Sequence, residues 1–252
     1  MIMKILICGK GGCGKSTVVA LLAKELARRE NRVWVIDSDE SNIGLAQRLG
    51  MDKPDDFMNY FGGKKILFEK ARQMANKWTT DDLPEDYLSS KGNITFLTMG
   101  KIYEFGEGCA CPINALAARV LEVLDLQDNE FLIADTDAGI EHFGRGVEKG
   151  VHLLVVIISP SRDSILLAQK ISILGKQVNK PTYYVLNRVN RETEKVLLDS
   201  VDKEKVIAVI HENKDVFMSC LAGNELTISL EGIEQIADRL ESEKRKAISQ
   251  SI

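Results

Sequence analysis

The sequence predicts an α/β fold: a doubly wound, mostly parallel sheet of about seven strands with helices on both faces. Two observations support this prediction. Short apolar runs rich in β-branched residues recur along the chain, and segments with helical spacing lie between them. Several runs are almost continuously apolar, as expected of strands covered on both faces. The runs lie at 4–9, 32–37, 93–100, 130–137, 152–159, 181–189 and 206–210.

The segments between these runs complete the predicted organisation. Apolar residues recur with helical spacing in 16–29, 113–124 and 165–178. Residues 50–92 are charged and proline-containing with few strand signals, so we expect a helical insertion between two strands there. Because no Pro/Gly/Ser-rich linker or internal repeat interrupts the pattern, residues 1–252 are predicted to form a single domain.

Composition restricts the class of protein. The chain has 252 residues, of which 44% are hydrophobic and 28% charged, and its net charge of −4 argues against a nucleic-acid partner. No secretory segment is evident, and the longest apolar stretch, 153–158, is too short to cross a bilayer. We therefore expect a cytoplasmic protein with no membrane partner. The chain has five cysteines, and an odd number in a reducing compartment does not suggest a disulfide framework.

The segment "GKGGCGKST" fits the phosphate-loop pattern G-x-x-x-x-G-K-[ST] and lies between a predicted strand and a helix. Its glycines let backbone N–H groups turn toward phosphate, and the helix that follows contributes its positive N-terminal end. Lys15 is expected at the β/γ-phosphate oxygens and Ser16 at Mg²⁺. The predicted nucleotide-binding residues of this loop are Gly9, Lys10, Gly11, Gly12, Cys13, Gly14, Lys15, Ser16 and Thr17.

A second lysine, Lys10, follows the first glycine of the loop and completes the pattern "KGGxGK". This pattern resembles the deviant Walker A loop of MinD/ParA-type ATPases. The resemblance implies that Lys10 reaches across a homodimer interface to the partner's nucleotide, with ATP held between two subunits. The alternative is that Lys10 is a solvated loop charge.

Two carboxylates, Asp37 and Asp39, follow the second predicted strand in "DSDESN". The carboxyl ends of strands are where doubly wound folds bind ligands. The resemblance implies that Asp39 orients the attacking water and that Asp37 supports the Mg²⁺ shell. One of them could instead cap a helix that begins near Ser41.

The segment "ADTDAGI" follows the fourth predicted core strand. Asp135 ends an apolar run, which is the position of a carboxylate that holds Mg²⁺ through water. Asp137 and Gly139 are expected to form a switch loop that senses the γ-phosphate. His142 is interpreted as part of this switch rather than as a metal ligand, because a single histidine is a weak metal signal.

Asn187 follows another strand, in "VLNRV". By resemblance it recognises the adenine base. The aspartate that GTP-binding proteins carry three residues later is replaced by Asn190, which favours ATP over GTP.

Two cysteines, Cys109 and Cys111, lie in "GEGCACPINA". A disulfide between residues i and i+2 is strained, whereas a loop before a helix N-terminus favours the thiolate that binds metal. Such ligands suit Zn²⁺, Ni²⁺, Cu⁺ or an iron–sulfur cluster. One chain supplies two of them, so two loops meeting at a dimer axis could provide four. A redox pair and an accidental proximity remain as alternatives.

Together, "GKGGCGKST", "DSDESN", "GCACP", "DTDAGIEHFGRG" and "SPSRDS" resemble the CooC family of nickel-insertion ATPases. The resemblance spans nearly the whole chain. It implies a homodimer, dependent on nucleotide and metal, that binds ATP/ADP, Mg²⁺ and one Ni²⁺ (or Zn²⁺ in vitro) through Cys109 and Cys111 of both subunits. Glu40 stands where proline is common, which leaves the client open between carbon monoxide dehydrogenase and acetyl-CoA synthase. The alternatives are an iron–sulfur carrier or reductase of the same superfamily and, with less support, a MinD/ParA-type positioning ATPase.

Overall fold

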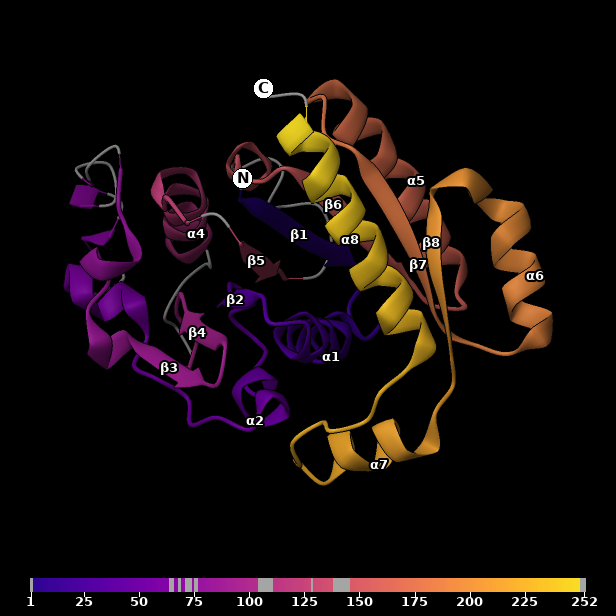
Figure 1. Ribbon diagram of the computed structural model, residues 1–252, viewed down its shortest axis with the longest axis horizontal. Coiled ribbons are helices and arrows are strands. Elements are labelled where there is room, and N and C mark those ends of the chain that lie inside the picture. Colours follow the sequence, from indigo (N-terminus) through magenta and orange to yellow (C-terminus); the bar gives the residue numbers. More distant parts are fainter. Residues whose placement is uncertain are drawn as a thin grey trace.

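An eight-stranded sheet forms the centre of the structure, a computed structural model (Figure 1). The strand order is β3-β4-β2-β5-β1-β6-β7-β8, and all neighbours are parallel except the antiparallel pair β3 and β4. The predicted α/β fold is therefore confirmed. The strands are β1 Met3–Gly9, β2 Arg32–Asp37, β3 Leu88–Lys91, β4 Ile94–Thr98, β5 Glu130–Asp135, β6 Leu153–Ile158, β7 Thr182–Val189 and β8 Val206–His211. The structure describes residues 2–63, 66–67, 69–70, 74, 77–103, 111–127, 129–137 and 146–249.

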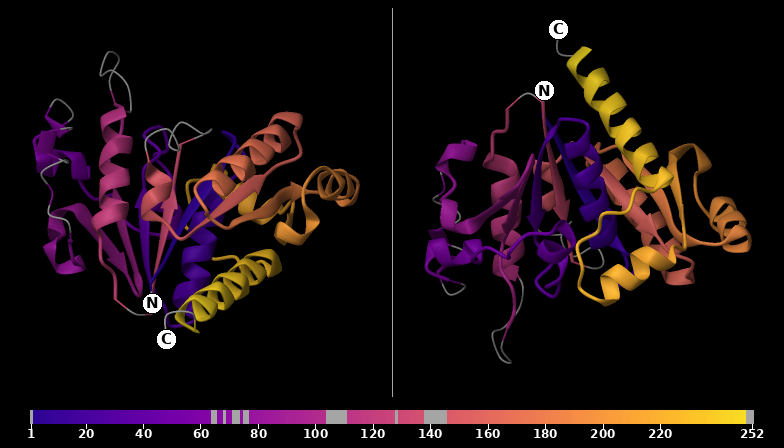
Figure 2. Two further views of the ribbon diagram at one scale, coloured as in Figure 1. Left: turned by 90° about the horizontal axis from the view of Figure 1, so that it is seen from above. Right: turned by 60° about the horizontal axis from the view of Figure 1, so that its bottom comes forward.

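Helices cover both faces of the sheet, as Figure 2 shows. Alternate strand residues point to opposite faces, and both sets are apolar, which explains the continuous apolar runs. Helices α4, α5 and α6 pack on one face, and α1, α2 and α8 pack on the other. Within the described ranges, no helix combines the length and apolar character needed to cross a membrane. The helices are α1 Lys15–Arg28, α2 Leu45–Leu49, α4 Cys111–Val123, α5 Arg162–Gln177, α6 Arg191–Ser200, α7 Lys214–Leu221 and α8 Glu231–Ser249.

The sheet contains one strand that was not predicted, β3, and it corrects the expectation for residues 50–92. Residues 50–92 were expected to be helical, and they do contain the 3₁₀ helices η1 (Phe57–Phe61), η2 (Thr80–Asp82) and η3 (Glu85–Tyr87). The segment ends, however, in β3, which pairs with β4 through a two-residue loop after Lys91. Gly92 opens this loop with φ of +57°, a typical position for glycine in a tight hairpin. The "KGN" turn is the signal that the pattern analysis missed.

The parallel register brings the candidate residues to one edge of the sheet. Strands β1, β2 and β5 are neighbours, and their register aligns Asp37 with Asp135 and Ile7 with Asp135. Because parallel strands end at the same edge, the loops after these strands meet there. This edge carries the candidate site.

Candidate functional site

The loop between β1 and α1 holds the predicted phosphate-binding residues. Gly14 has φ of +97°, and a Cβ at this position would collide with the side-chain amide of Asn187. At Gly9, a Cβ would lie 2.6 Å from the carbonyl oxygen of Ile157 on the adjacent β6. Both positions therefore require glycine, for backbone conformation and for space.

The N-terminus of α1 differs from those of α5, α6 and α7. Side chains of Ser161, Asn190 and Asn213 cap α5, α6 and α7 by accepting backbone hydrogen bonds. By contrast, α1 starts from Gly14 with no side-chain cap, and its first residue, Lys15, is buried. An uncapped helix start beside a buried lysine is suited to bind the oxygens of a phosphate group.

Lys10 forms an ion pair with a residue of the same chain. Its Nζ donates a hydrogen bond to Oδ2 of Asp163, in the first turn of α5, at 2.7 Å. The two side chains are 41% and 72% exposed, and exposed ion pairs contribute little to stability. Lys10 can therefore leave Asp163 readily, and its expected role across a dimer interface stays a prediction.

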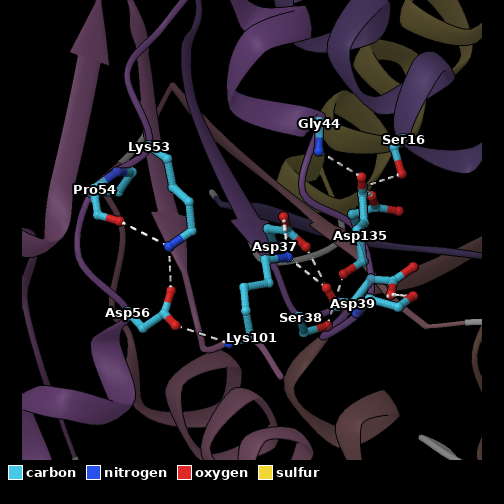
Figure 3. Close-up of polar contacts among 12 residues, drawn as sticks. Ser16, Asp37, Ser38, Asp39, Gly44, Lys53, Pro54, Asp56, Lys101 and Asp135 are labelled. Carbon is cyan, nitrogen blue, oxygen red and sulfur yellow. Dashed lines mark hydrogen bonds and ion pairs between the residues drawn. The ribbon is translucent and has the colours of Figure 1, made fainter. Parts of the chain in front are cut away.

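Three buried carboxylates, Asp37, Asp39 and Asp135, lie together at the sheet edge (Figure 3). The pKa of Asp37 is raised, mainly because the side chain is buried. The Lys101 ammonium opposes this shift, and the negative charge of Asp135 adds to it. Burial also raises the pKa of Asp135, against the lowering effects of Ser16 and Lys15. Such a concentration of buried negative charge is typical of a site that receives a cation.

The residues predicted to hold magnesium include two that lie together. The side-chain amide of Asn42 donates to Oγ of Ser16 at 2.6 Å and to Oδ2 of Asp135 at 3.3 Å. The other oxygen of Asp135, Oδ1, is buried and has no hydrogen-bond partner within the described part of the chain. A hydroxyl and an unsatisfied carboxylate oxygen are the hard oxygen donors that Mg²⁺ prefers, so the residues present fit this ion.

Asp37 and Asp39 are held differently from each other. Oδ2 of Asp37 accepts from Nζ of Lys101 at 2.7 Å, in an ion pair whose side chains are both 2% exposed. Oδ1 of Asp39 accepts from the backbone N–H and the hydroxyl of Ser41 at 3.0 and 2.6 Å. The helix expected near Ser41 begins only at Leu45, after an N-cap at Gly44.

Lys101 is a site residue that the sequence analysis missed. It lies just after β4, in "TMGKIYEF", where a lysine is ordinarily exposed. The local pattern carries no signal of its burial, because the partner carboxylate lies 64 residues earlier in the chain.

Asn187 lies against the phosphate loop. Its Nδ2 donates to the carbonyl oxygen of Cys13 at 2.8 Å, and Arg188 donates from Nη1 to the carbonyl oxygen of Gly12 at 3.0 Å. Both residues line a pocket of about 600 Å³ beside Thr17. Its other wall comes from β8 and α7 and was not predicted, although it follows the carboxyl end of a strand. That wall includes His211, Asn213, Phe217 and Cys220.

The remaining predicted residues are described in part. Asp137 follows β5 at this edge, and Cys111 is the first residue of α4 and is half-buried. Cys109, Gly139 and His142 lie outside the described residues. Within the described part of the chain, no three histidine, cysteine or acidic side chains are grouped so that they could hold a metal ion by themselves, and the fit to Mg²⁺ rests on Ser16 together with Asp135.

Known proteins resemble this chain along most of its length. Residues 4–226 match the family model described as the CobQ/CobB/MinD/ParA nucleotide binding domain. An uncharacterized ATP-binding protein of Methanocaldococcus jannaschii is 47% identical, with 94% of this chain and 99% of the relative covered. The carbon monoxide dehydrogenase accessory protein CooC of Rhodospirillum rubrum is 33% identical, with 82% and 83% covered.

Solved structures agree on the fold. The septum site-determining protein MinD of Pyrococcus horikoshii, solved with Mg-ADP, matches with a TM-score of 0.71 and 19% identity, over 98% of each chain. A ParA family ATPase of Chlorobium tepidum matches with a TM-score of 0.63 and 18% identity, over 95% of this chain and 98% of that one. The family match covers the phosphate loop, the carboxylates and most of the pocket beside Thr17, and the chain belongs to the CobQ/CobB/MinD/ParA nucleotide-binding family.

Proposed function

We propose that this chain is an ATP-hydrolysing metallochaperone that binds nickel at a dimer interface. It promotes nickel insertion into carbon monoxide dehydrogenase or acetyl-CoA synthase, in the cytoplasm. The observation that carries the proposal is the pair Cys109 and Cys111, in a chain 33% identical to a carbon monoxide dehydrogenase accessory protein. Neither a nucleic acid nor a membrane takes part.

The phosphate loop supports binding of ATP with magnesium. Lys15 and the uncapped start of α1 bind the phosphates, and Ser16 and Asp135 hold the magnesium ion, with Asp37 supporting them from β2. When bound, Mg²⁺ neutralises negative charge on the phosphate oxygens. Asn42 must release Ser16 and Asp135 for this binding, because its amide joins them in the structure.

The pocket of about 600 Å³ beside Thr17 and Asn187 supports selection of adenine. Asn187 uses its Nδ2 to donate to the carbonyl of Cys13, so its Oδ1 is the atom that can accept from a ligand. The exocyclic amino group of adenine is a donor, whereas the corresponding group of guanine is a carbonyl oxygen. An Oδ1 that faces the base would accept from the amino group of adenine, which supports the choice of ATP.

Hydrolysis uses Asp39, Lys10 and Lys15. Asp39 orients the attacking water through the carboxylate oxygen that Ser41 does not use. Lys15 and the partner's Lys10 stabilise negative charge on the transferring phosphate. Asp137 and Gly139 respond to the γ-phosphate as a switch.

The surface around the nucleotide pocket supports a homodimer. Ile43, next to Asn42, is 74% exposed, and Phe217 and Leu221 on α7 are 62% and 70% exposed. Apolar side chains exposed to this extent suit burial against a second copy. Lys10 belongs to the phosphate loop, and its proposed partner is the nucleotide of the second subunit.

A test of the dimer uses Lys10→Ala, with Lys203→Ala as the matched control because Lys203 lies far away on η6 (Lys203–Lys205). With ATP, the wild type and the control form a dimer in size-exclusion chromatography, whereas Lys10→Ala remains largely monomeric. Equal dimer in all three proteins would contradict the role of Lys10 across the interface.

The cysteine pair supports the nickel cargo. Two subunits provide four sulfur ligands from Cys109 and Cys111, and Cys111 is the first residue of α4. Because ATP and nickel both bias the same dimer, each changes the affinity of the other.

The metal-binding test replaces both cysteines with serine and uses Cys220→Ser as the matched control. The wild type and the control bind nickel in a fixed ratio by elemental analysis after desalting, and the double variant does not. The wild type and the double variant bind ADP with the same affinity, because the cysteine pair is not part of the phosphate loop. Cys220 lines the pocket beside Thr17, so Cys220→Ser is the control for nickel binding only. Retention of stoichiometric nickel by the double variant would refute the metal site.

An iron–sulfur carrier is the second candidate, because it would use the same two cysteines. Visible absorbance after anaerobic purification distinguishes it, since a cluster is strongly coloured and a nickel thiolate site much less so. A positioning ATPase, the third candidate, would co-sediment with vesicles or DNA in the presence of ATP.

A further inference from the structure

Lys101 is buried to an unusual degree for a lysine. It lies just beyond β4 and is 1% exposed. Removing an ammonium group from water is costly, and a buried ion pair is often no more stable than apolar side chains of similar volume. The position of Lys101 therefore suggests a role beyond stability.

The contacts of Lys101 fix the backbone of Asp39 from both sides (Figure 3). Nζ of Lys101 donates to the carbonyl oxygen of Asp39 at 2.5 Å and to Oδ2 of Asp37 at 2.7 Å. Oδ1 of Asp37 in turn accepts from the N–H of Asp39 at 3.1 Å. The peptide groups on both sides of Asp39 are thus held by one connected set of three residues.

The Asp39 side chain is held as well. Its Oδ1 accepts two hydrogen bonds from Ser41, and within the described ranges its Oδ2 accepts none. With the backbone and one oxygen fixed, the second oxygen keeps a defined direction. This is the arrangement required of a group that orients a water molecule.

Lys101 is itself anchored on the opposite side. Its backbone N–H donates to Oδ2 of Asp56 at 3.1 Å, and Oδ1 of Asp56 pairs with Lys53 at 2.6 Å. Lys53 also donates to the hydroxyl of Tyr103 at 2.7 Å. These contacts tie the segment after β4 to the segment before η1.

We propose that Lys101 is a positioning residue for ATP hydrolysis, which holds Asp39 in the orientation that aims Oδ2 at the attacking water. The inference rests on the proposed role of Asp39 in hydrolysis. Lys101 acts through Asp39 and Asp37 and does not contact the nucleotide. Its loss therefore lowers kcat and leaves nucleotide affinity almost unchanged.

The test is a double-mutant cycle on Lys101→Met and Asp39→Asn, with Lys4→Met as the matched control, because Lys4 is also a buried lysine but lies at the amino end of β1, away from the site. We expect Lys101→Met to lower kcat about tenfold to a hundredfold, since small errors in placing a catalytic group are costly. Its affinity for a fluorescent ADP analogue stays within about threefold of wild type, and the kcat of Lys4→Met stays close to wild type. A purely structural role of Lys101 would not lower kcat while leaving nucleotide affinity unchanged. The double variant is no slower than Asp39→Asn, because both changes disable the same group.

The outcomes separate this inference from the proposed function. Normal hydrolysis by Lys101→Met would overturn the role of Lys101 and leave the proposed role of Asp39 intact. The same holds if the rate reduction of the double variant equals the product of the reductions in the two single variants. Normal hydrolysis by Asp39→Asn would overturn the proposed role of Asp39 and, with it, this inference. If Lys101→Met does not fold, the double variant Lys101→Met/Asp37→Asn replaces it in the cycle, because this variant removes both buried charges. The single variant Asp37→Asn then serves as its reference.

Discussion

Replacing Asp135 with asparagine is expected to stabilise the nucleotide-free fold and to abolish its response to magnesium. The Asp135 side chain is fully buried at the end of β5, and its Oδ1 has no hydrogen-bond partner within the described part of the chain. Burial raises its pKa to about 6, although Ser16 and Lys15 act in the opposite direction. Above that pH, the folded chain therefore contains an ionised carboxylate in an unfavourable environment.

The expected gain follows from this shift. The pKa rises from 3.8 to about 6. At about 1.36 kcal/mol per unit this gives roughly 3 kcal/mol, which structural relaxation reduces to about 1–3 kcal/mol. Because the folded state binds this proton more tightly than the unfolded chain, the contribution of Asp135 is favourable below about pH 4 and is lost as the pH rises past about 6. Asparagine does not titrate, so the advantage of the variant grows from near zero at about pH 4 to its full value at about pH 8.

Urea unfolding in EDTA at both pH values measures this difference, with Asp86→Asn as a matched exposed control that changes neither value. Isothermal titration with Mg-ADP tests the second part: magnesium tightens ADP binding to the wild type and the control but not to Asp135→Asn. A wild type as stable as the variant at pH 8, or an advantage of equal size at both pH values, would refute the reasoning.

Three further predictions concern the phosphate loop and its neighbours. Gly14→Ala forces a left-handed residue against the amide of Asn187, so we expect ADP affinity to fall at least about tenfold in a fluorescence titration. Asp163→Asn frees Lys10, so ATP-dependent dimerisation in analytical ultracentrifugation becomes severalfold tighter, and an unchanged dimer would contradict this. Asn42→Ala removes the amide that joins the two proposed magnesium ligands, so the ATPase reaches half-saturation at a lower Mg²⁺ concentration. Half-saturation at a higher Mg²⁺ concentration would show instead that Asn42 is itself a magnesium ligand.

Most of the sheet could be predicted because its signals are local. Seven apolar runs and the helices between them follow from periodicity, since parallel strands buried on both faces must be continuously apolar. The strand β3 could not be found in this way. It is a short edge strand with the sequence "LSSK", and its apolar content is too small to form a run.

The sequence could predict those residues of the candidate site that lie at the carboxyl ends of strands. The phosphate loop, Asp37, Asp39, Asp135 and Asn187 all lie at carboxyl ends of strands, so their proximity follows from the fold. Partners that approach from distant parts of the chain were not predictable. Lys101 meets Asp37 and Asp163 meets Lys10 through tertiary packing that no local pattern records.

The nucleotide site and Cys111, the proposed nickel ligand that the structure describes, both follow carboxyl ends of strands in the sheet, so coupling between them needs no long path. Lys101 contacts Asp37 and Asp39 on one side, and the chain runs from it through 104–110, which contains Cys109, to Cys111 at the start of α4. Coupling requires contacts that differ between nucleotide states, and we propose that the contacts of Lys101 with Asp37 and Asp39 are of this kind. Lys101→Met should therefore weaken the effect of a non-hydrolysable ATP analogue on nickel affinity, while nickel affinity without nucleotide stays close to wild type. Competition titrations with a colorimetric nickel chelator measure both values, and an undiminished effect of nucleotide would place the coupling elsewhere.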